Sequence, residues 1–242
     1  MRLALAGLAM LTTLALAGSA SAAPANIEAA IHDPGRPAAD TARDADRKPA
    51  ETLEFSRVRP GEVVLEIAPG GGYFTRLLSK AVGPGGHVYA VAPPQMQKAV
   101  AAIAADPAYA NVTVLGVAPE EMAKVPPVDL IFTAQNYHDL HLTQVHMDVA
   151  ALDAGWFKLL KSGGTLFILD HVALAGAPVT ETADKLHRID PAAVRHEVEA
   201  AGFVFDGESD ILRNSADPHT AIVFDPAIRG HTDQFLFRFK KP

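Results

Sequence analysis

The chain has no cysteine among its 242 residues, and this absence excludes two kinds of stabilisation. It can form no disulfide, and it offers no cysteine for a lipid anchor. A disulfide-stapled scaffold is therefore ruled out, and the fold has to be held by a hydrophobic core. Hydrophobic residues make up 49% of the sequence, and residues 23–242 are long enough for one α/β domain.

The chain also lacks an excess of positive charge. Its 21 Lys and Arg residues are outnumbered by 28 Asp and Glu residues, and no basic stripe occurs. Binding to nucleic acid needs clustered cations that neutralise phosphates, so we expect no nucleic-acid partner. Internal repeats and low-complexity linkers are absent from residues 23–242 as well.

Only one long apolar run is present, and it lies at the start of the chain. Leu3–Ala17 follows a single Arg2 and leads to Ala20-Ser21-Ala22, an Ala-x-Ala cleavage pattern. The run predicts a signal peptide over residues 1–22, cut after Ala22, and is short for a membrane span. We therefore expect a periplasmic or secreted protein without stable membrane insertion after cleavage; the weak charge of one Arg leaves an uncleaved anchor as the alternative.

Short β-branched runs alternate with helical patterns from residue 58 onward, which favours a parallel, doubly wound sheet. Strands are expected at Val63–Ile67, His87–Val91, Val112–Leu115, Val128–Thr133 and Thr165–Asp170. Helices are expected at Phe74–Ala81, at Gln95–Ala105, and from Thr143 to Gly163-Gly164, the last with Trp156 in the core. Residues 23–57 are expected to form a helical cap, with helices at Pro37–Asp46 and Pro49–Phe55, before the main domain of residues 58–242.

The C-terminal part breaks the alternation. A helix from Asp190-Pro191 to Gly202 precedes a strand at Phe203–Ile211, and the final strand, Phe235–Lys240, has no helix before it. Two strands without an intervening helix imply an antiparallel pair, which makes seven strands in all. The polar segment 213–233 between them is either a lid over the site or a structural loop with turns. As a lid it would present Asn214, Asp217, His219, Asp225 and Arg229.

The most informative stretch is Val63–Thr75, which reads VVLEIAPGGGYFT. A buried strand ends in an acidic residue and is followed by a glycine-rich turn and a helix, so that a nucleotide-type cofactor can approach the backbone. A dinucleotide fingerprint would need a third glycine where Thr75 stands, and this disfavours a nicotinamide-dependent oxidoreductase. The spacing Glu66-x-Ala68-x-Gly70-x-Gly72 fits better with another cofactor.

That spacing resembles the first motif of class I S-adenosylmethionine (SAM)-dependent methyltransferases. The stretches RKPAETLEF, VVLEIAPGGGYFTRLLS, VYAVAPP, QNYHDLH, LLKSGG, LHRIDPAAVRHEVEAAGF, GESDILRNSADPHT and FDPAIRGHTDQFLFRFKKP resemble a group of exported, predicted bacterial members of that family. The resemblance implies a Rossmann-like class I methyltransferase fold with a mostly parallel seven-stranded sheet. It also implies SAM as cofactor and a small-molecule or peptide-like methyl acceptor.

The resemblance assigns cofactor contacts after the first four strands. They are Glu66, Ala68, Pro69, Gly70, Gly71, Gly72 and Tyr73, then Ala92 and Pro93, then Glu120, and finally Gln135 and Asn136. Ala92 departs from the family, which usually has an acidic residue there to hold the ribose. The adenine-side acidic position is filled by Glu120 or Glu121, a residue or two late. These departures keep a non-catalytic binding protein on the same scaffold as the alternative.

Candidate catalytic residues follow the fourth and fifth strands, whose carboxyl ends open to the same crevice. They are Tyr137, His138, Asp139 and His171, with His138 or His171 as general base. The same region could instead hold a divalent ion through Asn136, Asp139, Asp170 and His171, an alternative we rank below the metal-free site. The charged stretch Arg43–Lys48 is interpreted first as a solvated helix face; in the alternative, Arg43 or Arg47 meets the carboxylate of the cofactor.

Overall fold

The computed structural model describes residues 23–242. The expected signal peptide and its cleavage after Ala22 lie outside the described residues. Within residues 23–242, no helix combines the length and apolar character that crossing a membrane requires.

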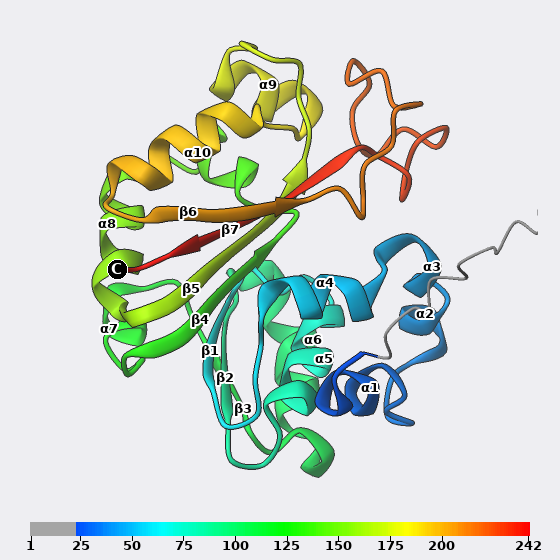
Figure 1. Ribbon diagram of the computed structural model, residues 1–242, viewed down its shortest axis with the longest axis vertical. Helices are drawn as coiled ribbons and strands as arrows, with labels where there is room; N and C mark the ends of the chain where they lie inside the picture. The colour runs from blue at the N-terminus through cyan, green and yellow to red at the C-terminus, as the bar shows by residue number, and fades with distance from the viewer. Residues whose placement is uncertain (1–22) are drawn as a thin grey trace, which may run out of the picture.

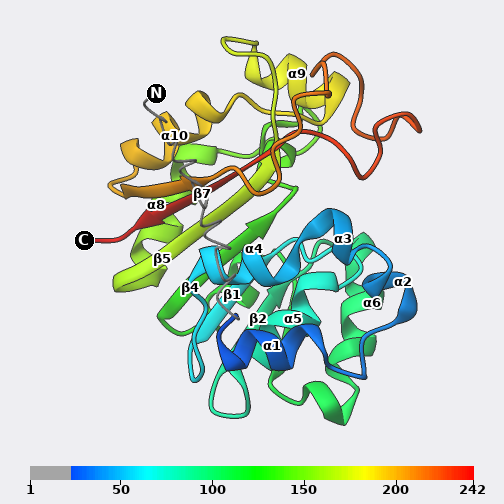
Figure 2. The same ribbon diagram turned by 45° about the vertical axis from the view of Figure 1, so that its right-hand side comes forward.

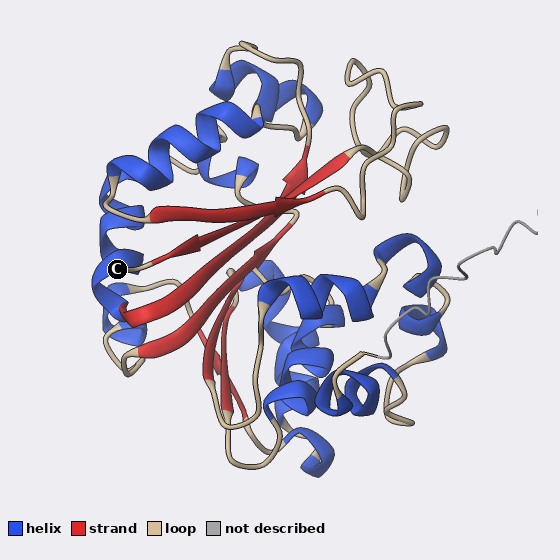
Figure 3. Cartoon of the chain, in the orientation of Figure 1, coloured by secondary structure: helices blue, strands red, loops and turns tan. Residues whose placement is uncertain are grey.

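One mixed sheet of seven strands organises the chain (Figure 3). The strands are β1 (Val63–Ile67), β2 (His87–Val91), β3 (Val112–Leu115), β4 (Val128–Ala134), β5 (Leu160–His171), β6 (Val204–Ser209) and β7 (Gln234–Lys240). Their order is β3-β2-β1-β4-β5-β7-β6, and β7 runs antiparallel to both neighbours. This confirms the predicted seven-stranded α/β fold with an antiparallel C-terminal pair.

Helices cover both faces of the sheet (Figure 1). On one face lie α1 (Ala25–Ile31), α4 (Pro49–Ser56), α5 (Tyr73–Val82) and α6 (Pro94–Ala104). On the other lie α7 (Pro119–Met122), α8 (Val149–Leu159) and α10 (Pro191–Ala200). The remaining short elements are α2 (Ala38–Thr41), α3 (Asp44–Arg47), α9 (Val179–Leu186) and the 3₁₀ turns Pro107–Tyr109 and His138–His141.

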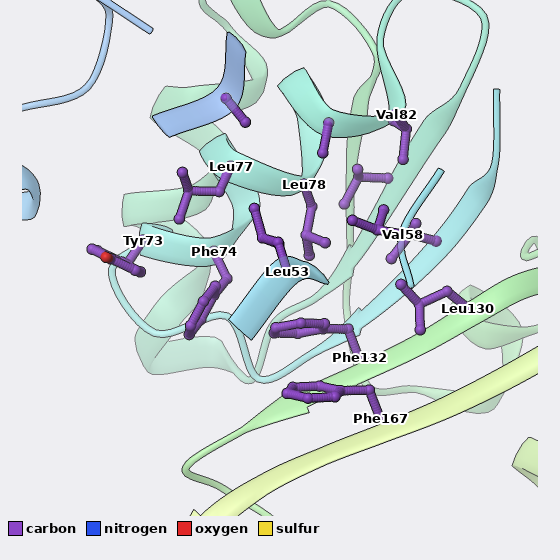
Figure 4. Packing of buried hydrophobic residues seen from close by; sticks show 14 of the residues in the cluster. Leu53, Val58, Tyr73, Phe74, Leu77, Leu78, Val82, Leu130, Phe132 and Phe167 are labelled. Carbon is purple, nitrogen blue, oxygen red and sulfur yellow. The ribbon is translucent and has the colours of Figure 1, made fainter. Parts of the chain in front are cut away.

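Aromatic packing joins the two central strands β4 and β5 to the helices on one face of the sheet. Phe132 of β4 stacks on Phe167 of β5 with ring centroids 4.5 Å apart, and Phe74 of α5 packs on Phe132 at 4.9 Å (Figure 4). Both strand residues are fully buried, as is Leu53 of α4. Because these rings join α4 and α5 to two central strands, the N-terminal helices share one core with the sheet. The loops at its carboxyl edge are therefore anchored on a rigid base.

The helix before β5 differs from its predicted bounds at both ends. It begins after Asp148, whose carboxylate accepts the N–H of Ala151, whereas Thr143 bonds Asp184 instead. It ends at Leu159, because β5 starts at once with Leu160 paired to Val128. The two glycines predicted to stop the helix therefore lie inside β5. Trp156 is 2% exposed, which confirms its predicted place in the core.

The predicted helix at Pro37–Asp46 is divided into α2 and α3 by a turn at residues 42–43. Figures 1 and 2 place α3 on one side of the carboxyl ends of the central strands and segment 213–233 on the other. The site therefore lies between a segment from the start of the described chain and one from near its end.

Candidate active site

Three residues of the glycine-rich turn between β1 and α5 have a left-handed backbone conformation. Ala68, Gly70 and Gly72 have φ values of 47°, 59° and 81°, in the left-handed region that favours glycine. A Cβ built on Gly70 or Gly71 would meet no atom within 4 Å, so this side of the turn is open to a ligand. A Cβ on Gly72 would lie 2.1 Å from Cδ1 of Ile103. A side chain at Gly72 would therefore have to displace Ile103 of α6, and the role of Gly72 as a cofactor contact stays a prediction.

Glu66 lies at the end of β1 beneath this turn and is unusual among the buried residues. It is 3% exposed, and its Oε2 atom has no hydrogen-bond partner within residues 23–242. Burial raises the pKa of Glu66 to about 8, and nearby Thr75 offsets only part of that rise. An orphaned carboxyl oxygen under an open glycine turn is a feature that a polar ligand would explain.

A cavity of about 500 Å³ opens beside the turn, over the carboxyl ends of β1, β2 and β4. Its walls include the predicted cofactor contacts Ala68, Pro93 and Asn136, and also Asp139. The remaining walls are Ile67, Val91, Gln95, Met96, Val117, Met122, Leu140, Leu142, Gln144, Val145, Met147, Leu152 and Trp156. Mostly apolar walls with a few polar groups and this volume are typical of a small-molecule site. We call it the first cavity.

Asn136 fixes the shape of that cavity. Its side-chain amide donates to the carbonyl oxygens of Ile67 and Ala68 at 3.0 and 3.1 Å, and its Oδ1 accepts from the hydroxyl of Thr133. These bonds join the end of β4 to the glycine turn after β1. Asn136 therefore holds the turn in place as well as lining the first cavity.

Other predicted cofactor residues lie elsewhere. Ala92 is fully buried and Glu120 is exposed on α7, and neither lines the first cavity. The Tyr73 ring is buried, and its hydroxyl donates to Asp44 at 2.6 Å. Pro69 also lies outside the lining residues. The structure therefore does not bring these four side chains to the cavity, and its lining also lacks Glu66, Gly70, Gly71, Gly72 and Gln135.

A second cavity of about 540 Å³ lies across the turn that follows β4. It is lined by Arg43, Asp46, Arg47, Gln135, His171, Val223, Phe224, Arg229, Gly230, Thr232 and Gln234. Its walls therefore come from α3, from the ends of three strands and from segment 213–233. Gln135 borders this cavity while the next residue, Asn136, borders the first, so a single turn separates the two.

Segment 213–233 contributes only part of what a lid would offer. Of the five polar residues expected to face a ligand, Arg229 alone lines the second cavity. Asp217 forms a fully buried ion pair with Arg188 at 2.8 Å, and His219 bonds Asp233 at 2.9 Å. These contacts anchor the segment to the body of the protein.

Arg47 contradicts the interpretation of Arg43–Lys48 as a solvated face. Its guanidinium donates to Oε1 of Gln135 at 2.5 Å and lies 4.6 Å from the ring centroid of Tyr73. Burial, and then the charge of Arg43, lowers the pKa of Arg47 to about 10. Within the described chain, no carboxylate forms an ion pair with it. Arg43 is exposed, as expected.

His138 and Asp170 form a buried pair between the cavities. Nδ1 of His138 lies 2.7 Å from Oδ1 of Asp170, and Oδ2 of that carboxylate accepts the backbone N–H of His138 at 2.7 Å. Burial lowers the pKa of His138, but the carboxylates of Asp170 and Asp139 outweigh it and raise the pKa to about 10. His138 therefore carries a proton at neutral pH when nothing else occupies Nε2, and it cannot then act as a base.

His171 has the opposite character. Its Nδ1 atom lies 2.7 Å from Oγ1 of Thr232, and the residue lines the second cavity. Burial lowers the pKa of His171 to about 4, because the carboxylate of Asp170 offsets only part of the desolvation. A neutral imidazole therefore faces the second cavity at neutral pH. Of the two predicted bases, this one is unprotonated and free to accept a proton at neutral pH, and its low pKa makes it a weak base.

Tyr137 is not brought to either cavity. It is fully buried, and its hydroxyl donates to Asp153 at 2.8 Å and contacts Glu197 at 3.2 Å. Burial and these two carboxylates raise the pKa of Tyr137 far above its usual range. The structure therefore gives it a place in the core under α8 and α10, which corrects the expectation of a catalytic role.

Sequence reasoning missed His187. Its Nδ1 atom lies 3.3 Å from Nε2 of His138 and 3.4 Å from Oδ1 of Asp139. It follows α9, 49 residues beyond His138, and no local motif marks it. The Ile189 N–H, which donates to the His171 carbonyl, brings this part of the chain against the end of β5.

Comparisons with known proteins support the class of fold. A methyltransferase from Aquifex aeolicus described as SAM-dependent superposes with a TM-score of 0.59 at 19% identity, covering 83% of this chain and 98% of that one. The [4+2]-cyclase SpnF matches with a TM-score of 0.58 at 16% identity, over 82% of this chain and 81% of that one. The protein thus has the class I methyltransferase fold, and this fold is shared by a cyclase.

Sequence comparison adds short matches to one enzyme from three strains of Legionella pneumophila. A segment of 37 residues is 57% identical to the ubiquinone/menaquinone biosynthesis C-methyltransferase UbiE of Legionella pneumophila strain Lens. The match spans 15% of this chain and 15% of that enzyme's length. No family model matches the chain.

Proposed function

We propose that this chain, with its class I methyltransferase fold, transfers a methyl group from SAM to a small-molecule or peptide-like nucleophile. The observation that carries the proposal is the pair of cavities separated by the turn after β4. One adjoins the glycine-rich turn, and the other presents a neutral imidazole. In this assignment the first cavity takes the cofactor and the second takes the acceptor.

The residues around the first cavity fit SAM. The turn leaves open space above Gly70 and Gly71, and the orphaned oxygen of Glu66 lies beneath it. The apolar walls suit an adenine ring, and Gln95 and Gln144 provide hydrogen-bonding side chains in the lining. When bound, SAM would supply a methyl group on a sulfonium centre. Arg47 lines the second cavity, so its half-buried cation would hold the carboxylate group of SAM only where the cofactor reaches past the turn after β4.

In methyl transfer, the protein mainly aligns the cofactor with the acceptor and excludes water. His171 is placed to accept a proton from an acceptor in the second cavity, because its ring is neutral and held by Thr232. Gln135 and Gln234, bonded to each other at 2.9 Å, provide amide groups that orient the acceptor. Phe224 and Val223 supply apolar surface in the same cavity.

A binding protein without catalysis is the second candidate. This candidate is favoured by Ala92. Methyltransferases of the family usually have an acidic residue at this position that binds the ribose of SAM, whereas Ala92 is a buried alanine. Among the described residues, no carboxylate takes over that role beside Pro93 in the first cavity. The cyclase that shares this fold also shows that the fold does not fix the reaction. A binding protein would take up the cofactor and never turn it over.

A transfer assay with radiolabelled SAM distinguishes the two candidates. The purified chain is offered panels of phenols, thiols, amines and short peptides, and the label in each acceptor is counted. For an acceptor that is methylated, His171→Ala should keep cofactor affinity and lower turnover by about 10²–10⁴-fold. Cofactor binding with no transfer to any panel member would favour the binding protein, and equal turnover by His171→Ala would remove that residue from the chemistry.

We also propose, from the Leu3–Ala17 run alone, that residues 1–22 direct export. Expression of the full chain in a bacterium followed by N-terminal sequencing tests this. A periplasmic product that begins at Ala23 is expected, and an intact N-terminus in the cytoplasmic fraction would contradict it.

A further inference from the structure

Three side chains, of which Asp139 lines the first cavity, converge on one point. Nε2 of His138 lies 3.2 Å from Oδ1 of Asp139 and 3.3 Å from Nδ1 of His187. The same oxygen of Asp139 lies 3.4 Å from Nδ1 of His187. Two ring nitrogens and one carboxylate oxygen thus form a nearly equilateral triangle.

The size of that triangle matches a tetrahedral metal site. Zinc binds His nitrogen and carboxylate oxygen at about 2.0–2.1 Å, which puts two ligands of a tetrahedron roughly 3.3–3.4 Å apart. The three observed separations lie at or just below that value, whereas neighbouring ligands of an octahedral site at the same bond length would be roughly 2.9 Å apart. The atoms are therefore spaced as one face of a tetrahedron, with the fourth corner free.

The ligand atoms are also held in place from outside the triangle. Asp170 bonds Nδ1 of His138, which leaves Nε2 as the atom that faces the centre. Such a carboxylate behind the imidazole is what metal-bound histidines in proteins usually have. His187 has a φ of 53°, uncommon for a residue other than glycine, and its ring packs on Phe224 at 4.9 Å.

The four metal ligands considered from the sequence, Asn136, Asp139, Asp170 and His171, do not come together at one point. The amide of Asn136 is used by backbone carbonyls, and Nδ1 of His171 faces Thr232. Asp170 accepts the backbone N–H groups of His138 and His171 as well as the His138 ring. Of those four residues, only Asp139 belongs to the triangle.

We propose that His138, Asp139 and His187 bind a divalent transition-metal ion of the Zn²⁺ type, with a fourth position open to a ligand. The carboxylates of Asp139 and Asp170 supply two negative charges to offset those of the ion. The side chains of Asp139 and His187 are 36% and 24% exposed, so an ion can reach the site. Two histidines, one carboxylate and an open position are the pattern of catalytic rather than structural zinc sites.

The consequence for chemistry rests on the proposed function, whereas the binding of the ion does not. Because Asp139 also lines the first cavity, the open position lies beside the place assigned to the cofactor. An oxygen or sulfur acceptor bound there would lose its proton more easily and present a lone pair for methylation. The acceptor would reach this open position from the second cavity, where His171, whose ring centroid lies 5.8 Å from that of His138, would receive the proton.

Metal titration of the full folded chain tests the site directly. The protein is stripped with a chelator and titrated by calorimetry with Zn²⁺, Co²⁺ and Mg²⁺ in separate runs. One Zn²⁺ or Co²⁺ per chain is expected, with the intense visible absorption of tetrahedral Co²⁺, and no comparable Mg²⁺ binding. His187→Ala and the isosteric Asp139→Asn should each weaken Zn²⁺ binding at least tenfold. His32→Ala, which removes an exposed histidine just after α1, is the matched control and should bind as the parent does.

The results separate the two proposals. Two results would overturn the metal site: no binding of Zn²⁺ or Co²⁺, or equal binding by His187→Ala and His32→Ala. Nε2 of His138 would then carry a proton instead of a metal ion. Methyl transfer that persists in the chelator-treated protein would overturn the metal's catalytic role but not the proposed function. Stoichiometric Zn²⁺ binding that His187→Ala abolishes would support the site even if no methyl acceptor is found.

Discussion

Replacing Glu66 with Gln should change how the stability of the protein depends on pH. The Glu66 carboxyl is buried without a partner for Oε2, and burial raises its pKa from 4.5 to about 8. Between pH 4.5 and 8 the folded protein holds a proton that the unfolded chain releases. Stability conferred by Glu66 is therefore complete below pH 4.5 and is lost as the pH rises through 8.

The magnitude follows from the size of the shift. Each pKa unit corresponds to about 1.4 kcal/mol, so the shift from 4.5 to 8 amounts to about 5 kcal/mol lost across this range. Gln is uncharged at every pH and keeps a similar shape, so Glu66→Gln should lack this loss. The difference in unfolding free energy between variant and parent should grow in favour of the variant by up to that amount between pH 4.5 and 9.

Urea unfolding at four or five pH values from 4.5 to 9 measures this difference. The difference between parent and variant isolates Glu66, since all other groups titrate in both proteins. Glu54→Gln, an exposed change on α4, is the control and should track the parent throughout. If the curves of parent and Glu66→Gln run parallel over the whole range, then Glu66 is not protonated at neutral pH and the reasoning from its burial is refuted.

Three further substitutions test the packing that supports the site, each by thermal and urea unfolding. Gly72→Val should destabilise the fold, because its Cβ would lie 2.1 Å from Ile103 at a φ of 81°; an unchanged melting temperature would contradict this. Asp217→Ala should cost about 3–5 kcal/mol by leaving Arg188 as a fully buried, unpaired cation, and a loss under 1 kcal/mol would show that water reaches it. Phe132→Ala should cost about 3–5 kcal/mol through loss of a fully buried ring, and a smaller loss would mean that the core collapses around it.

The order of elements could be predicted from the sequence because each depends on local patterns. The strand β1 at Val63–Ile67 is bounded and apolar, and it was predicted with the residues that the structure shows. The antiparallel pair followed from two strands without a helix between them. The start of α8 was misplaced, since Thr143 and Asp148 are both good caps and only tertiary contacts decide between them.

From the sequence, the site could be located at the carboxyl ends of the strands, but the directions of its side chains could not be predicted. His138 and His171 follow neighbouring parallel strands, so their shared edge was predictable. The direction of a side chain after a strand is not local, and so Tyr137 was assigned to the crevice although its hydroxyl bonds Asp153 in the core. The sequence did not predict that His187 belongs to the site. This residue follows a distant helix and approaches His138 only once the whole sheet has formed.

Calorimetric titration with S-adenosylhomocysteine tests most directly the claim that the first cavity holds the cofactor. The chain offers a matched pair of exposed valines for this purpose. Val117 lines the cavity and is 55% exposed, whereas Val204 on β6 is 54% exposed and lies outside it. Both positions are exposed, but only a tryptophan side chain at position 117 would enter the first cavity.

The parent and Val204→Trp should bind one S-adenosylhomocysteine per chain, and neither should bind NADH. Val117→Trp should keep the parental melting temperature and bind S-adenosylhomocysteine at least tenfold more weakly. Absence of binding by the parent, or equal affinity of the two tryptophan variants, would contradict the assignment of the first cavity to SAM.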